Sequence, residues 1–195
     1  MEVIRMRKIN RLTEFDYSQN GAYFVTICTQ DMRCLFGQIV GTSENSDGSN
    51  VGAEEGVGEN VGERIAFPHN VTVIREQRPY MELSNTGKIV HDKIMAISQI
   101  YKSVSVSKYV IMPNHIHMII EIDNDFDESG NAMRSPTIST IMTQFKGAVS
   151  KAIGQKFWQK SFHDHIIRNQ IDYENIWNYI DVNIDNWYED EYNKM

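Results

Sequence analysis

Two histidines separated by one residue are the part of the sequence best suited to chemistry. His115 and His117 lie in the run 109–121, which is otherwise rich in β-branched and apolar residues. A β-strand has a side-chain period of two, so both imidazoles should project from the same face. Two imidazoles held side by side are a suitable pair of metal ligands. Taken alone, the pair is equally consistent with two exposed histidines on an edge strand.

A second candidate group lies near the end of the sequence. Tyr179 and Asn183 are four residues apart and therefore share one face of the helix predicted over 172–187. Both border the apolar stripe of that helix, which consists of Ile176, Ile180, Ile184 and Trp187. The tyrosine is either a core residue with its hydroxyl at the rim or a nucleophile. In the second case, the asparagine could offer a carbonyl oxygen to a metal held by the histidines.

Tyr173 is a rival nucleophile on the same predicted helix. The residue four positions after it is Trp177, which cannot ligate a metal. This difference favours Tyr179.

The elements that must position these residues follow from hydrophobic periodicity and turn signals. Strands are predicted over 22–29 and 35–40, as a hairpin, with the histidine strand inside 103–122 and a short strand inside 157–167. Helices are predicted over 82–101, capped by Ser84, over 139–153, stopped by Gly154, and over 172–187. The order predicts an α+β protein, in which helices pack against one antiparallel sheet.

Length and composition predict a single globular domain over residues 1–195, with 41% hydrophobic residues. Residues 41–63 are rich in Gly, Ser, Asn and Glu, and are predicted to form a flexible insertion at a hairpin tip. Cys28 and Cys34 are too few for a disulfide framework. No apolar run approaches the roughly 20 residues of a membrane span. We therefore expect a cytoplasmic protein without a membrane partner.

The net charge of −7 does not by itself favour a nucleic-acid partner. However, residues 44–63 carry six acids and no base, and residues 121–128 carry five acids and no base. Without these two segments the balance is positive. Two basic segments remain, with Arg5, Arg7, Lys8 and Arg11 in the first and Lys146, Lys151, Lys156 and Lys160 in the second. They can meet phosphates, or they are solvated surface charges.

Four blocks of the sequence resemble the REP-associated tyrosine transposases, a branch of the single-tyrosine HUH (His–hydrophobic–His) transposases related to the IS200/IS605 group. The blocks are the basic arm with residues 16–29, residues 110–117 around the histidines, residues 157–169, and the helix segment 178–183. They occur in the family's order, and the resemblance covers most of the chain. The insertion at 41–63 and the acidic net charge depart from the family's pattern.

The resemblance implies a ferredoxin-like HUH domain that cleaves and rejoins single-stranded, hairpin-forming DNA through a 5′-phosphotyrosine intermediate. It implies that Tyr179 is the nucleophile and that His115, His117 and Asn183 bind Mg²⁺ or Mn²⁺. It also makes a homodimer possible. Further residues are candidates for DNA contacts, each with a structural alternative: Arg5, Arg7, Lys8, Arg11, Lys146, Trp158, Gln159, His165 and Arg168.

Two other functions remain open for this sequence. The first is a domesticated descendant that binds repetitive hairpins without cutting them. The second is a metal-dependent phosphodiesterase that uses water, with Tyr179 in a structural role.

Overall fold

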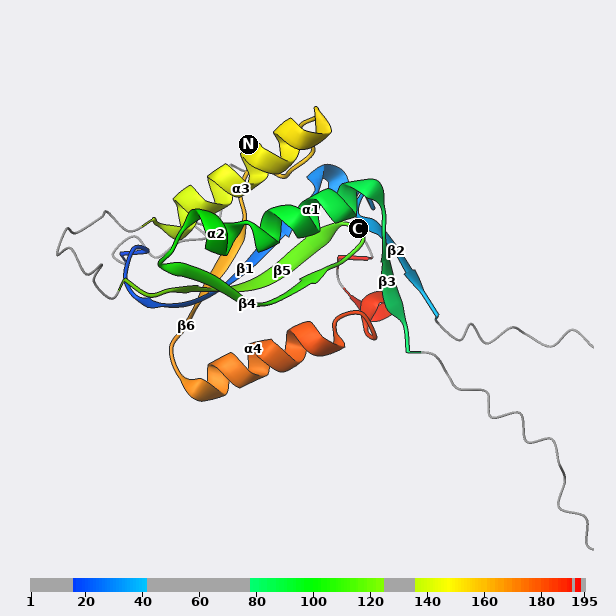
Figure 1. The fold of residues 1–195 in the computed structure, drawn as a ribbon. Helices are drawn as coiled ribbons and strands as arrows, with labels where there is room; N and C mark the ends of the chain where they lie inside the picture. Colours follow the sequence, from blue (N-terminus) through cyan, green and yellow to red (C-terminus); the bar gives the residue numbers. More distant parts are fainter. Residues whose placement is uncertain (1–15, 42–77, 125–135, 191, 194–195) are drawn as a thin grey trace, which may run out of the picture.

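The computed structural model describes residues 16–41, 78–124, 136–190 and 192–193 (Figure 1). The strands are β1 (Gly21–Cys28), β2 (Gly37–Val40), β3 (Tyr80–Leu83), β4 (Val104–Ile111), β5 (His115–Ile122) and β6 (His163–Ile167). The helices are α1 (Asn85–Met95), α2 (Ile97–Ile100), α3 (Ile138–Ile153) and α4 (Gln170–Val182). Two short 3₁₀ turns are η1 (Gln30–Met32) and η2 (Trp187–Glu189).

A four-stranded antiparallel sheet forms the centre of the fold, with the strand order β4-β5-β1-β6. The chain builds this sheet as β1–α1–β4–β5–α3–β6, which is the β-α-β-β-α-β connectivity of ferredoxin-like folds. The α+β class and the ferredoxin-like arrangement expected from the sequence are therefore confirmed. Within the described residues, no helix is long and apolar enough to cross a membrane.

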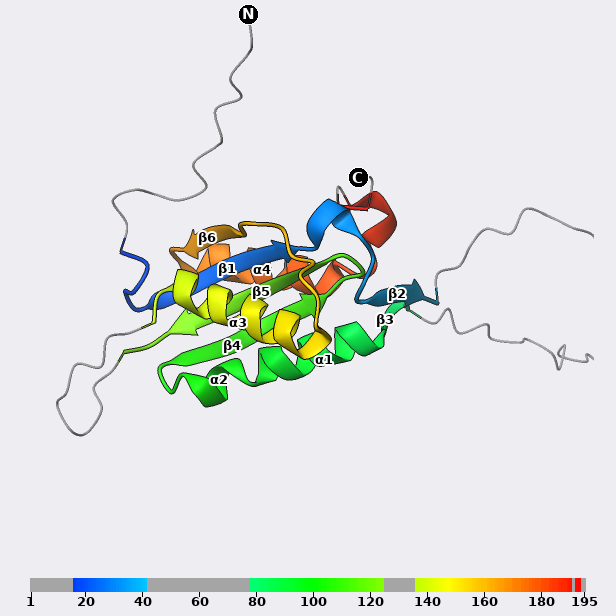
Figure 2. The same cartoon turned by 90° about the horizontal axis from the view of Figure 1, so that it is seen from above.

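Helices cover both faces of the sheet (Figures 1 and 2). Helices α1 and α3 pack together over one face, while α4 lies against β4 and β5 on the other. The side chains of β5 alternate accordingly: Ile116 and Met118 belong to the core under α1 and α3, and Ile119 belongs to the core under α4. This alternation places His115 and His117 on the α4 face.

The predicted hairpin between the first two strands is wrong. β2 does not pair with β1 but with β3, in a separate two-stranded sheet. Both edges of β1 are occupied by β5 and β6, so no edge remains for β2. The chain leaves the four-stranded sheet at the buried Phe36. The backbone amide of Phe36 donates to the carbonyl of Pro113, and its carbonyl accepts from the amide of Ser84.

The insertion predicted at 41–63 follows β2 and precedes β3. These two strands are consecutive antiparallel partners, with Val40 opposite Tyr80 at the open end. Residues 41–63 therefore stand in the sequence between two strands that pair with each other, which are β2 and β3 and not the predicted pair. Apart from Gly41, they lie outside the described residues.

The three predicted helices exist, with shifted ends. The first begins at Asn85, because Ser84 caps it by accepting from the amide of Gly87, and a break at Ala96 separates α1 from α2. α3 ends at Gly154 in the left-handed conformation, as predicted. α4 ends at Val182 instead of residue 187, because the chain turns through η2 and buries Trp187 beside the sheet.

Candidate metal and nucleophile site

The two histidines lie side by side and completely buried under the C-terminal part of the chain. His115 is 0% exposed, His117 is 1% exposed, and their ring centroids are 4.6 Å apart. They occupy the start of β5, opposite Cys28 and Thr26 of β1. The strand pairing therefore fixes both imidazoles on a rigid, dry surface.

Asn114 sets the tautomer of His115. The Asn114 Nδ2 atom donates to the carbonyls of Met32 and Tyr192, at 3.2 and 2.8 Å, which fixes the orientation of the amide. Its Oδ1 atom therefore accepts from His115 Nδ1, at 2.8 Å. The proton of the neutral ring is on Nδ1, and Nε2 carries the lone pair.

His117 is held by one hydroxyl at each nitrogen. Its Nδ1 lies 2.8 Å from Thr26 Oγ1, and its Nε2 lies 3.2 Å from the hydroxyl of Tyr179. The ring also stacks on Phe24, with 5.2 Å between centroids. These contacts leave the imidazole little freedom to rotate.

Both histidines are neutral at pH 7. Burial lowers the pKa of His115 to about 3. Burial also lowers the pKa of His117 well below its ordinary value, and the neighbouring His115 adds to this effect. A neutral imidazole is the form that binds metals, so neither ring must lose a proton before it can act as a ligand.

Helix α4 brings Tyr179 to His117, and Asn183 follows four residues later at the C-terminal end of the helix. Tyr179 is 42% exposed, so its ring is open to solvent while its hydroxyl contacts His117. Asn183 follows the last residue of α4 as its C-cap and is 3% exposed. A half-exposed tyrosine beside buried ligand-type groups is accessible to a large substrate.

Two buried polar atoms of this group have no hydrogen-bond partner, namely His115 Nε2 and Asn183 Oδ1. Buried polar atoms are normally paired, so each such atom calls for an explanation. Both carry lone pairs and face no donor, which is the situation that a cation relieves. Among the described residues, no three His, Cys, Asp or Glu side chains already form a metal cluster. The donor set of two imidazoles and one amide nonetheless fits a divalent ion.

The C-terminal turn closes the site from the other side. The Asp190 carboxylate lies with Oδ2 4.0 Å from His115 Nε2, and the ring of Tyr192 packs against His115 in a tilted arrangement with 4.5 Å between centroids. Sequence reasoning missed both residues, as well as Thr26 and Asn114. Asn114 directly precedes His115 and could have been considered, whereas nothing distinguishes Asp190 from the other acids near it in the sequence.

Tyr173, the rival nucleophile, lies elsewhere on α4. Its hydroxyl donates to Glu121 Oε1 at 2.9 Å, and its ring stacks on Trp177. Glu121 is on β5, four residues beyond His117, so Tyr173 is far along the helix from the histidines. This position favours Tyr179 as the residue to consider for nucleophilic chemistry.

Three of the candidate DNA contacts, Lys146, Trp158 and Gln159, contact one another, and the backbone amide of Gln159 donates to the carbonyl of Cys28. Lys146 is on α3, on the opposite face of the sheet, and donates to the carbonyls of Gln159 and Ser161 at 2.5 and 3.2 Å. Burial lowers the pKa of its ammonium group. Trp158 packs among phenylalanines and donates to the carbonyl of Lys146. Gln159 and Trp158 also line a shallow pocket with Gln30.

Two other candidate DNA contacts, His165 and Arg168, lie where β6 meets α4. His165 Nε2 lies 2.9 Å from the Asp172 carboxylate, which also accepts from the backbone amide of Arg168. The hydrogen bond from His165 is the main reason that the pKa of Asp172 is lowered. The four basic candidates of the N-terminal arm, Arg5, Arg7, Lys8 and Arg11, lie outside the described residues.

The fold and this site define an α+β protein in which a buried histidine pair faces a helix that carries a tyrosine. A family model described as "Transposase IS200 like" matches residues 66–183. The chain belongs to the IS200-like transposases, a family of DNA-processing enzymes. The relationship to IS200-type transposases expected from the sequence is therefore confirmed.

Two similar proteins extend over most of the chain. An uncharacterized protein of Haemophilus influenzae is 26% identical over 205 residues, which cover 96% of this chain and 93% of that protein. A solved structure described as "Structure of the REP associates tyrosine transposase bound to a REP hairpin" covers 89% of this chain and 72% of its own. Its sequence identity is 16% and its TM-score is 0.48.

Proposed function

We propose that this transposase cleaves and rejoins single-stranded DNA next to hairpin-forming repeats, with Tyr179 as the nucleophile. The observation that carries the proposal is the contact of the Tyr179 hydroxyl with His117 Nε2, at 3.2 Å, in a member of a transposase family. The hydroxyl is positioned by the same imidazole pair that can bind a metal. The ring is exposed, so a DNA strand can reach it.

In the proposed reaction, the Tyr179 hydroxyl oxygen attacks the phosphorus of the scissile phosphodiester. The new P–O bond leaves the 5′-phosphate on the tyrosine, while the bond to the 3′-oxygen breaks. The phenolic proton is lost and the 3′-oxygen gains one, so the products are a phosphotyrosine and a free 3′-OH. Attack by a 3′-OH on the phosphotyrosine reverses these changes and joins two strands.

The cation ligands in this proposal are His115 Nε2, His117 Nε2 and Asn183 Oδ1. Bound there, Mg²⁺ or Mn²⁺ would polarise the scissile phosphate and stabilise the charge that develops on the leaving 3′-oxygen. Asn114 and Thr26 hold the imidazoles in orientation through their Nδ1 atoms.

His117 Nε2 cannot serve the metal and the Tyr179 proton at the same time. Nε2 lies 3.2 Å from the tyrosine hydroxyl in the structure, and a metal ligand must present its single lone pair to the ion. Metal binding must therefore release the hydroxyl, which becomes available to the DNA. Loss of the hydroxyl in Tyr179→Phe should leave metal affinity unchanged or raise it, by up to about tenfold for a net hydrogen-bond energy of about 0.5–1.5 kcal/mol.

The first prediction tests the nucleophile. Wild-type protein, a hairpin oligonucleotide with single-stranded flanks from the gene's own locus, and Mn²⁺ should give a covalent adduct on a denaturing gel. Tyr179→Phe should abolish the adduct, because the attacking oxygen is gone, while retaining DNA affinity in an electrophoretic mobility shift.

Tyr173→Phe is the matched control, because it removes a hydroxyl from the same helix but leaves the histidines untouched. It should form the adduct at a rate within about threefold of the wild type. An adduct in Tyr179→Phe would refute the nucleophile. DNA binding by the wild type without any adduct would instead support the domesticated binder, and cleavage without an adduct would support hydrolysis by water.

A further inference from the structure

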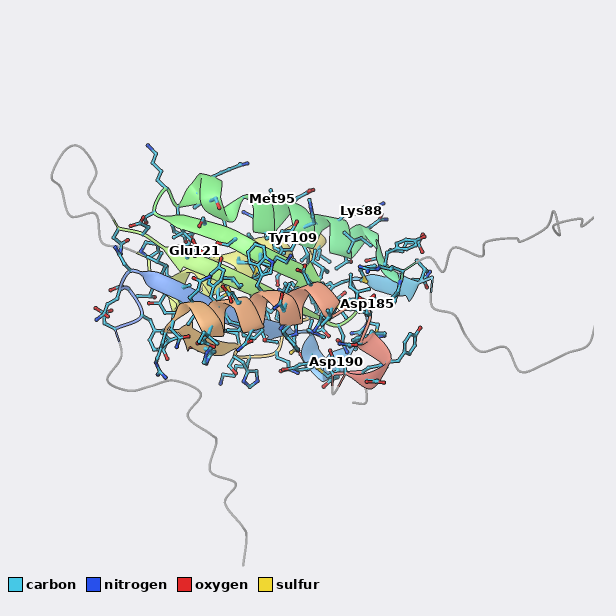
Figure 3. All side chains as sticks on the ribbon, turned by 90° about the horizontal axis from the view of Figure 1, so that it is seen from below. Lys88, Met95, Tyr109, Glu121, Asp185 and Asp190 are labelled. Atoms are coloured by element: carbon cyan, nitrogen blue, oxygen red, sulfur yellow. The ribbon has the colours of Figure 1, made fainter. Side chains whose placement is uncertain are left out.

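We propose that Asp190 is a fourth protein ligand of the divalent cation, so that the C-terminal turn completes the metal site. This inference rests on the proposed function, because Asp190 belongs to the same site. It is tested by metal binding and not by catalysis. Figure 3 shows Asp190 beside η2. Asp185 lies closer to the C-terminal end of α4. The carboxylate side chain is 7% exposed, in contrast to the exposed Asp185.

The first argument is the orientation of two acceptor atoms. Because His115 Nδ1 donates to Asn114, the neutral ring presents a lone pair at Nε2. The nearest carboxylate oxygen, Asp190 Oδ2, is also an acceptor. A cation that lies between two such acceptor atoms can bind both of them. Their separation of 4.0 Å is too long for a shared proton in a hydrogen bond.

The second argument is the distance itself. In an octahedral shell with metal–ligand bonds of about 2.1 Å, adjacent ligands are about 3.0 Å apart and opposite ligands about 4.2 Å apart. The 4.0 Å between Asp190 Oδ2 and His115 Nε2 is close to the distance between opposite ligands. One ion can therefore contact both atoms. Among the described residues His115, His117 and Asp190 do not already form a metal cluster, so these side chains must move to share the ion.

The third argument is the way in which the turn holds the carboxylate. Asp190 Oδ1 accepts from the backbone amide of Tyr192 at 2.9 Å, which leaves Oδ2 on the side of the histidine. The carbonyl of Tyr192 accepts from Asn114, and the ring of Tyr192 packs against His115. Asn114 thus positions both the imidazole and the turn that carries the carboxylate.

The added charge suits the ion. Two imidazoles and an amide form a neutral donor set, and imidazole alone favours Zn²⁺, Cu²⁺ or Ni²⁺ over harder ions. A carboxylate adds one negative charge and a hard oxygen, which are the properties that Mg²⁺ and Mn²⁺ prefer.

The second prediction tests this ligand by titrating the metal-free protein with Mn²⁺ and following the electron paramagnetic resonance signal of the free ion. In Asp190→Asn, the Kd for Mn²⁺ should rise at least about tenfold, since even the loss of an outer-shell partner costs about 10–100-fold in affinity. Asp185→Asn makes the same charge change on the exposed neighbouring segment and should stay within about twofold of the wild type.

Folding is checked by thermal unfolding without metal. Asn can still accept from the amide of Tyr192, so the turn should persist and the Tm should equal or exceed that of the wild type. Saturating Mn²⁺ should raise the Tm less in Asp190→Asn than in the wild type, because stabilisation depends on affinity. Asp190→Ser, whose hydroxyl can accept from the same amide, is a second variant with the same expected loss.

Equal Mn²⁺ affinity in the wild type and both Asp190 variants would overturn the assignment, as would a wild-type protein that binds no Mn²⁺. The proposed function can fail separately. Mn²⁺ binding that depends on Asp190, without any covalent DNA adduct, would retain the ligand and reject the reaction. An adduct together with equal affinities would retain the reaction and reject the ligand.

Discussion

Asn114 connects three parts of the site through one side chain. It bonds to His115 on β5, to the carbonyl of Met32 in η1 and to the carbonyl of Tyr192 after η2. These partners are distant in sequence, and each uses a different lone pair or proton of the amide. An Asp at this position would lose the hydrogen bonds to both carbonyls, because a carboxylate oxygen replaces the amide NH₂ group.

The residues that sequence reasoning found and those that it missed differ in a physical way. His115, His117, Tyr179 and Asn183 were found because regular spacing on a strand or helix indicates a shared face. Asp190 lies in an irregular turn, where no period relates a residue to the site. Thr26 becomes significant only through the pairing of β1 with β5, which depends on register and not on local sequence.

The third prediction concerns acid stability at the residue scale. His115 and His117 stay neutral in the folded protein but protonate in the unfolded chain near their ordinary pKa of about 6.5. Because their folded pKa values are lowered, the stability that they contribute is complete above pH 6.5 and is lost as the pH falls toward 3. Well below pH 6.5, where the unfolded chain binds both protons, two such groups give a limiting slope of about 2.7 kcal/mol per pH unit, and between pH 7 and pH 6 the change is about half of that.

Urea denaturation of the metal-free protein at pH 7, 6 and 5 measures this slope. His117→Gln removes one titrating group while keeping a polar side chain, so the slope should fall by about half, or about 1.4 kcal/mol per pH unit. An unchanged slope in this variant would show that His117 gains a proton in the folded state as readily as in the unfolded chain.

At the scale of elements, α3 and α4 have different tasks although both are amphipathic. α3 closes the core on one face of the sheet, and its Lys146 holds the chain that leads into β6. α4 covers the other face and carries Tyr179, which contacts His117. Lys108 on β4 fastens α4, because its ammonium pairs with Asp181 and lies 4.4 Å from the ring of Trp177.

The fourth prediction follows from this division of tasks. Lys146→Met should lower the free energy of unfolding by about 1–3 kcal/mol, because two carbonyl groups lose their donor. Affinity for hairpin DNA, measured by fluorescence anisotropy, should stay within about twofold, because the ammonium group is already engaged on the face opposite to Tyr179.

Lys151→Met is the matched control on the same helix, where the side chain is exposed. It should change the free energy of unfolding by less than about 0.5 kcal/mol. A Lys146→Met variant that is fully stable but binds DNA poorly would instead place Lys146 among the phosphate contacts expected from the sequence.

The positions of the helices and strands were largely predictable from the sequence, but the pairing of the strands was not. The helices carry an apolar stripe and recognisable caps at Ser84 and Gly154, which are local signals. The pairing of β2 with β3 is not local, because about forty residues separate the two strands. Only the fact that β5 and β6 occupy both edges of β1 excludes the simpler hairpin.

At the scale of the whole molecule, the site depends on the four-stranded sheet, and the β2–β3 pair lies at one end of it (Figures 1 and 2). Phe36 and Gly87 join the two parts, because the carbonyl of Phe36 approaches Gly87 so closely that a Cβ there would clash. Residues 42–77 of the connection between β2 and β3 lie outside the described residues.

The fifth prediction tests whether that connection is dispensable. Replacing residues 42–77 with a four-residue Asn/Gly turn keeps Val40 opposite Tyr80, which are the last paired residues of β2 and β3. The Tm, the Mn²⁺ affinity and the yield of the covalent adduct should all match those of the wild type. A loss of DNA affinity with an intact Tm would assign a DNA contact to the replaced segment.

The pairing of β5 with β1 has a consequence for how this chain can change over evolutionary time. One alternation of side chains both buries Ile116 and Met118 and presents His115 and His117 to Tyr179. Substitutions can accumulate on either face while the other is preserved. A single-residue insertion or deletion inside β5 would exchange the two faces beyond it. Lineages should therefore differ in length at the β2–β3 connection but not within this strand.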